Sequence, residues 1–195
     1  VAGGPQQIYL WNRYSGNIEL ISKSAVSGNP AASDCSPPGI SPSGYAVAFS
    51  CADDTLVAGD SNSLADTFVL NYSTKEFWMA NTVQGGANGP SSMTIRPGVS
   101  EGGSVVAFVS SATNLVEDDT NAREDIFLYD KDKAEMIRVN VASDGTASYG
   151  GIGSLMLSGN GASLIYDSVA GDLVEQDTNG LADIFLWDKD GLYNN

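Results

Sequence analysis

A short sequence motif recurs along this chain and constrains its fold more than any other feature. A polar loop with an acidic residue at each end runs directly into an apolar strand, at residues 60–70, 119–130 and 177–188. A shorter copy at residues 7–12 keeps the strand and lacks the loop. Gln7, Asp66, Asp125 and Asp183 occupy the same position of the motif, just before the strand, so the motif recurs about every 59 residues. A repeat of this period indicates supersecondary units that pack on their neighbours, so it sets the architecture before any local prediction.

Tight turns mark a second fixed point in each unit. They end at Gly44, Gly103 and Gly161, which follow the same period, and Gly adopts positive φ without strain. The strand after each turn is almost continuously apolar, which is typical of a strand covered on both faces. The acidic loop, the apolar strand, a polar turn and a closing strand follow. No segment has the length and the 3.6-residue period of a helix.

The sequence therefore predicts an all-β fold made of β-propeller blades. Each blade has four antiparallel strands in a repeat of about 59 residues, and the chain holds three or more blades. A β-sandwich is the competing all-β fold, but it would not require the same strand text to recur in register. The predicted organisation is a single β-propeller segment over 1–195, with a half blade at 1–27, blades at 28–85 and 86–143, and an incomplete blade at 144–195.

The sequence leaves three ways in which the propeller could be completed. A closed propeller typically has at least four blades, which leaves a fragment of a larger propeller, two chains forming a ring of about six blades, or an open head-to-tail assembly. Because unpaired terminal strands favour pairing, we expect self-association or additional blades from the same or another chain. The chain starts at Val1 rather than Met, which fits a removed leader or a piece of a longer protein.

The net charge of the chain limits the classes of partner that it is expected to bind. There are 24 acidic and 9 basic residues, a net charge of −15, which disfavours nucleic acid and anionic membranes and favours divalent cations. No apolar run approaches the roughly 18 residues of a membrane span. The chain has no His, so it lacks the commonest general base, and it has no nucleophile elbow or phosphate loop. These observations predict a protein that is not an enzyme and has no catalytic residues.

The acidic loops have the composition of a cation site. Each follows the pattern Asp-x-Asn-x-x-x-Asp, and carboxylate and amide oxygens are ligands that Ca²⁺ prefers. The predicted metal ligands are Asp60, Asn62, Asp66, Asp119, Asn121, Asp125, Asp177, Asn179 and Asp183. Zinc is disfavoured without His, and Mg²⁺ tends to keep its water. The alternative is purely structural, because Asp and Asn at loop ends also form Asx-turns without metal.

The two cysteines flank the first tight turn. Cys35 and Cys51 lie at equal distances in sequence on either side of Ser43, so they would face each other on paired strands if the hairpin has no bulge. We predict a disulfide between them, which is typical of an exported protein. The alternative is a pair of buried free thiols.

With these residues identified, the chain resembles the WD40-like (PD40) repeats of TolB-type propellers. The matching text is Ser41-Pro42-Ser43-Gly44, Ala48-Phe49-Ser50 and Asp125-Ile126-Phe127-Leu128-Tyr129-Asp130. The resemblance implies a β-propeller, whereas propellers of this type have binding, assembly and enzymatic roles alike. The chain departs from the pattern where Ser43, Gly102 and Asn160 replace the turn Asp, and where the loop is lengthened to carry the acidic motif.

The function predicted from the sequence is an exported, calcium-stabilised β-propeller with a structural or self-assembling scaffold role. Its predicted location is extracellular, at the cell surface or periplasmic. One alternative is a periplasmic or surface TolB-like module that binds a protein or a glycan. A third hypothesis, a propeller hydrolase or lyase, would require a single acidic centre rather than repeated loops.

Overall fold

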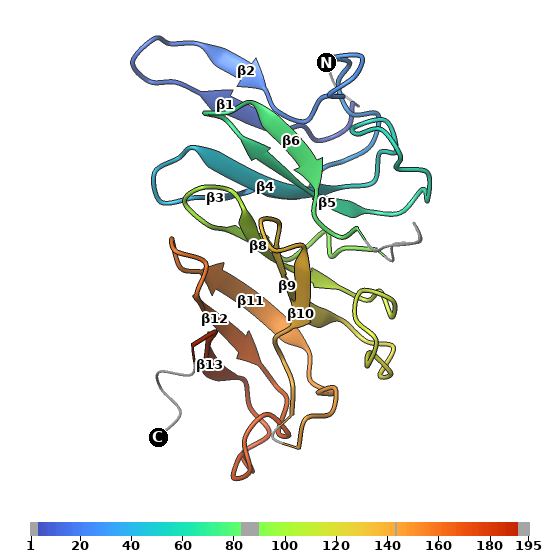
Figure 1. The fold of residues 1–195 in the computed structure, drawn as a ribbon, viewed down its shortest axis with the longest axis vertical. Helices are drawn as coiled ribbons and strands as arrows, with labels where there is room; N and C mark the ends of the chain where they lie inside the picture. Colours follow the sequence, from blue (N-terminus) through green and yellow to red (C-terminus); the bar gives the residue numbers. More distant parts are fainter. Residues whose placement is uncertain (1–3, 83–89, 143, 191–195) are drawn as a thin grey trace.

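The computed structural model describes residues 4–82, 90–142 and 144–190, and within them it contains strands and turns without a helix. Consequently no described segment forms a helix that could cross a membrane. The predicted unit boundaries at 85/86 and 143/144 involve residues outside the described ranges. Four antiparallel sheets follow one another along the long axis of the molecule (Figure 1).

Each sheet is a meander in chain order. The first pairs β1 (Tyr9–Trp11) with β2 (Ile18–Leu20). The second contains β3 (Gly39–Ile40), β4 (Ala46–Cys51), β5 (Asp66–Asn71) and β6 (Glu76–Met79). The third contains β7 (Gly98–Val99), β8 (Val105–Ser110), β9 (Asp125–Asp130) and β10 (Glu135–Arg138). The fourth contains β11 (Ile152–Leu157), β12 (Ser163–Ser168) and β13 (Asp183–Asp188).

The repeat in the sequence is a repeat in strand register. The last residue of β4, β8 and β12 pairs with the first residue of the next strand, as Cys51↔Asp66, Ser110↔Asp125 and Ser168↔Asp183. Two complete sheets have the four antiparallel strands expected of a blade. The prediction of an all-β fold built from propeller blades is therefore confirmed.

Neighbouring sheets pack through two unlike faces. The second sheet turns small residues, such as Ala46 and Ala48, toward the third sheet, which presents Phe108 and Phe127. The third sheet repeats this with Ala107 against Tyr166 of the fourth. All six residues of β4 and of β8 are buried, as expected for strands covered on both faces. The same expectation is wrong for β12, where burial alternates and Ile165 is 47% exposed, because no described sheet covers its second face. Burial of each large apolar side chain contributes about 1.5–3 kcal/mol, so these interfaces hold the sheets together.

The first strands of the second and third sheets approach the next sheet too closely for a side chain. A Cβ atom on Gly39 would lie 1.9 Å from the carbonyl oxygen of Pro97, and one on Gly98 would lie 2.7 Å from Cβ of Leu157. Glycine at these two positions, which are one repeat apart, therefore lets the short strands β3 and β7 converge on their neighbours.

Candidate metal centres in the acidic loops

The three acidic loops occupy the same place in their sheets. Each connects the second strand of a blade to the third, and its last Asp is the first residue of β5, β9 or β13. The strand register therefore fixes the position of that Asp. The fourth loop position is left-handed in all three copies, with φ of 56° at Ser63, 52° at Ala122 and 64° at Gly180. Three loops with different residues at this position thus share one conformation.

The first loop brings two carboxylates together. Asp66 is fully buried, and its Oδ1 accepts hydrogen bonds from the amide nitrogens of Asn81 and Asn62. Its Oδ2 is buried without a hydrogen-bond partner, as are both carboxylate oxygens of Asp60. Burial is the main reason why the pKa of Asp66 rises to about 6, and the charge of the neighbouring Asp60 adds to it, whereas the bond from Asn81 opposes the rise.

The second loop repeats this arrangement with one difference. Asp125 Oδ1 accepts from Asn140 Nδ2 at 2.6 Å and from Asn121 Nδ2 at 3.3 Å. Asp125 Oδ2 and both oxygens of Asp119 have no hydrogen-bond partner. Burial raises the pKa of Asp125, and the charge of Asp119 acts in the same direction. The difference is Arg138, whose Nη1 lies 3.7 Å from Asp119 Oδ1 as an ion pair.

The third loop is more open. Asp183 is half-buried, and its Oδ2 accepts from Asn179 Nδ2 at 3.1 Å. Asp177 keeps one buried oxygen, Oδ2, without a hydrogen-bond partner. In the described part of the chain β13 is an edge strand, so no closing strand supports this loop in the way that Asn81 and Asn140 support the other two.

The asparagines of the motif form Asx-turns. The side-chain oxygens of Asn62, Asn121 and Asn179 accept the backbone N–H two residues on, at 2.7, 2.9 and 2.6 Å. Their amide nitrogens face the carboxylates. The structural role raised as an alternative is thus present in all three copies, and the asparagines as placed orient the carboxylates rather than offer a free oxygen. The six aspartates are the stronger candidate ligands.

The unpartnered oxygens are the chemical feature that the loops share. Buried carboxylate oxygens are almost always hydrogen-bonded, because an unpaired buried charge is strongly unfavourable. Among described residues, buried side-chain polar atoms without a hydrogen-bond partner belong to five loop aspartates and to two other residues, Ser91 and Arg138. A hard cation would satisfy such oxygens. No cluster of three or more Asp, Glu, Cys or His side chains occurs among the described residues, so backbone carbonyls or water would have to complete the coordination.

The supporting asparagines are the part of the site that the sequence analysis missed. Asn81 and Asn140 each follow the closing strand of their blade and are one repeat apart. Their side-chain oxygens also accept the backbone N–H of Thr67 and Ile126, at 3.0 and 2.7 Å. Each amide therefore links the closing strand to the start of the third strand. Their recurrence at the repeat period was a signal that could have identified them.

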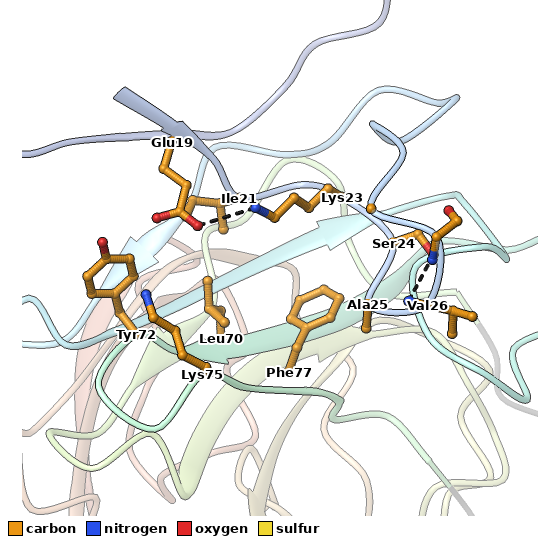
Figure 2. A pocket seen from close by; sticks show the side chains of 12 residues that line it. Glu19, Ile21, Lys23, Ser24, Ala25, Val26, Leu70, Tyr72, Lys75 and Phe77 are labelled. Carbon is orange, nitrogen blue, oxygen red and sulfur yellow. Dashed lines mark hydrogen bonds and ion pairs between the residues drawn. The ribbon is translucent and has the colours of Figure 1, made fainter. Parts of the chain in front are cut away.

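A separate cavity lies beside the N-terminal hairpin. Its volume is about 480 Å³, and Figure 2 shows Glu19 and Lys23 on one side and Leu70 and Phe77 on the other. Lys23 is paired with Glu19 at 3.2 Å. The Lys75 ammonium lies 3.3 Å from the centre of the Tyr72 ring. These charges are satisfied within the cavity, so its lining does not point to a ligand, and none of its residues belongs to the acidic loops.

Comparison with known proteins supports the fold. No protein-family model and no curated protein matches the sequence. A putative TolB from Agrobacterium tumefaciens matches the structure with a TM-score of 0.55 and 20% identity, over 98% of this chain and 56% of the other. The chain forms a β-propeller segment. The β-propeller domain of the Trilobed protease from Pyrococcus furiosus also matches, with a TM-score of 0.48 and 14% identity, over 80% of this chain and 40% of the other.

This β-propeller segment thus spans 56% of the length of the TolB structure it matches. The TolB-like resemblance read from the sequence motifs is supported at the level of the fold. Identities of 20% and below carry no information about ligands or activity.

Proposed function

We propose that the acidic loops bind Ca²⁺ and that the chain is an exported β-propeller scaffold stabilised by this ion. The observation that supports the proposal is the recurrence of buried, unpartnered carboxylate oxygens at one position of the blade. Asp60 with Asp66, Asp119 with Asp125, and Asp177 with Asp183 would hold the ions. A bound ion would supply positive charge and oxygen coordination, and so tie the loop to the first residue of the third strand.

Export is supported by the cysteines and by the charge. Cys35 and Cys51 are joined by a disulfide, a bond that persists in oxidising compartments. A net charge of −15 suits a soluble surface outside the cytoplasm, where Ca²⁺ is abundant. We therefore propose a periplasmic, cell-surface or extracellular location.

The scaffold role is supported by the two ends of the row of sheets. On the fourth sheet, Met156, Ile165 and Leu186 form one cross-strand row and are 71, 47 and 52% exposed. The residues of the third sheet equivalent to Ile165 and Leu186, Ala107 and Leu128, are fully buried. We propose that a second copy of this chain covers the exposed row.

The other end of the molecule carries matching residues. Tyr9 and Trp11 on β1 are 60 and 65% exposed. They occupy the repeat positions of Phe127 and Tyr129, which pack toward the preceding sheet. The first sheet of one copy can therefore meet the fourth sheet of another through the contacts already used inside the chain.

Calcium should raise the melting temperature of the chain. A ligand at ten times its Kd adds about 1.4 kcal/mol of stability, which corresponds to about 3–6 °C for a protein of this size. Differential scanning calorimetry in CaCl₂ and in EDTA measures the shift, and isothermal titration measures binding. Mg²⁺ at the same concentration serves as the control. Absence of both heat and thermal shift with Ca²⁺ would reject the calcium proposal.

The exposed row on the fourth sheet should mediate self-association. Ile184 is 78% exposed and lies two residues before Leu186 on β13, so the two side chains share one face. Two charges introduced by I184D/L186D would oppose burial of that face, so the variant should have a lower mean mass than the wild type. Val26 is 77% exposed in the loop after β2 and lies outside the exposed row, so V26D is a control that should leave the mass unchanged. Sedimentation velocity reports the masses. A monomeric wild type, or equal association of wild type and double variant, would contradict this assignment.

A further inference from the structure

One position differs in charge between two otherwise equivalent loops. Met79 ends β6 and Arg138 ends β10, and the two residues are one repeat apart. Each lies two residues before the asparagine that supports the carboxylate, Asn81 or Asn140. The two acidic loops therefore have equivalent surroundings, except that this position is Met79 beside the first loop and Arg138 beside the second.

Arg138 is directed at the carboxylates of the second loop. Its side chain is 6% exposed, and the side chain of Asp119, 3.7 Å away, is fully buried. Nη1 also donates to the carbonyl oxygen of Asp118 at 3.0 Å, whereas Nε is buried without a partner. A guanidinium carries its charge at any accessible pH. The second loop thus contains a permanent counter-charge within a few ångströms of its carboxylates.

The first loop has no such group. Met79 is apolar, and among the described residues no ion pair joins Asp60 or Asp66 to a basic side chain. A further carboxylate, that of Asp54, accepts hydrogen bonds from the backbone N–H and the hydroxyl of Ser63 in this loop, so it adds negative charge beside the loop. The first loop therefore has the same buried oxygens as the second and more uncompensated negative charge.

We propose that Arg138 is an internal counter-cation that weakens Ca²⁺ binding at the second loop, so that the first loop, with Met79 in its place, is the tighter calcium site. This inference rests on the proposed function, because it assumes that the loops bind Ca²⁺. Its physical basis is Coulombic: a positive charge beside the carboxylates repels the incoming ion and already neutralises part of the charge that the ion would neutralise.

The test isolates the second loop and changes only the counter-charge. In a D60N/D177N background, which disables the first and third loops, R138M should tighten the Kd for Ca²⁺ by about tenfold or more, because a unit charge within ~4 Å is removed. R138K keeps the charge and serves as the matched control, with a Kd close to that of the background. Isothermal titration measures the affinities, and circular dichroism verifies that each variant is folded.

The reciprocal change tests the first loop. In a D119N/D177N background, M79R should weaken Ca²⁺ binding by about tenfold for the same reason. M79L is the control for packing, since Met79 is partly buried against the core of the second sheet. Because M79R can also disturb this core, the R138M measurement decides the question.

The outcomes separate the two proposals. If the wild type binds no Ca²⁺ at any loop, the proposed function fails and the inference fails with it. If the wild type binds Ca²⁺ but R138M leaves the Kd unchanged, or R138K tightens it as much as R138M does, the role of Arg138 is wrong and the calcium proposal stands.

Discussion

In EDTA, the unfolding free energy of the wild type, measured relative to that of its D66N variant, should fall by about 3 kcal/mol between pH 3 and pH 7. The pKa of Asp66 is raised from 3.8 to about 6 in the folded chain, mainly by burial. Between these values the folded state keeps a proton that the unfolded state has lost. Stability from this group is therefore present at low pH and is lost as the pH rises from about 4 to 6.

The comparison with D66N removes the contributions of other groups. Asp53, Asp130 and Glu19 have lowered pKa values, so their stabilisation is lost as the pH falls and acts in the opposite direction. These contributions are common to both proteins and cancel. Urea denaturation at a series of pH values gives the difference, and D118N, at an exposed loop position, is a matched control. Parallel curves for wild type and D66N would contradict the burial of an ionised, uncompensated Asp66. Saturating Ca²⁺ should flatten the difference, since the ion favours the ionised carboxylate.

Loss of the disulfide should destabilise the chain by a similar amount. The Cys35–Cys51 bond closes a loop with a sequence separation of 16, for which the chain-entropy model gives about 3 kcal/mol. The C35A/C51A variant should therefore melt roughly 6–12 °C below the wild type. Alanine is preferred to serine because both cysteines lie in the apolar core with Ile8 and Phe49, where burial of a hydroxyl group would add a desolvation cost of its own.

Reductant provides the internal control for this experiment. Dithiothreitol should lower the melting temperature of the wild type toward that of C35A/C51A and leave the variant unchanged. Because the variant has no cysteine left to reduce, an equal response of both proteins would mean that dithiothreitol acts by a route other than reduction of this bond. If dithiothreitol does not lower the melting temperature of the wild type, and C35A/C51A melts at the same temperature as the wild type, the bond adds nothing to stability.

The architecture could be predicted because the sequence repeat identifies the equivalent strands of successive blades. Asp66, Asp125 and Asp183 begin equivalent strands, so one alignment of the chain on itself places three blades in register. The buried inner strands were equally readable, since β4 and β8 are apolar at nearly every position. These features are local in sequence or periodic, and a single sequence records both kinds directly.

The details of the site depend on contacts that sequence spacing does not reveal. Asn81 reaches Asp66 across 15 residues because β6 folds back beside β5, and only the register of that hairpin brings the two together. The orientation of Asn62 depends on an Asx-turn that competes with metal coordination for the same oxygen. Arg138 could be read from the sequence only as one more surface charge, although the structure buries it against Asp119.

The packing between successive sheets determines which insertions and deletions this chain can accept. The second and third sheets turn an alanine of their second strand toward an aromatic residue of the next sheet, so Ala48 meets Phe108 in the same way as Ala107 meets Tyr166. Removing or inserting one whole repeat would therefore bring together surfaces that already fit, with no substitution required. A deletion of an odd number of residues within a strand would instead turn the side chains beyond it to the opposite face. Whole blades are thus the natural unit of insertion and deletion in this protein.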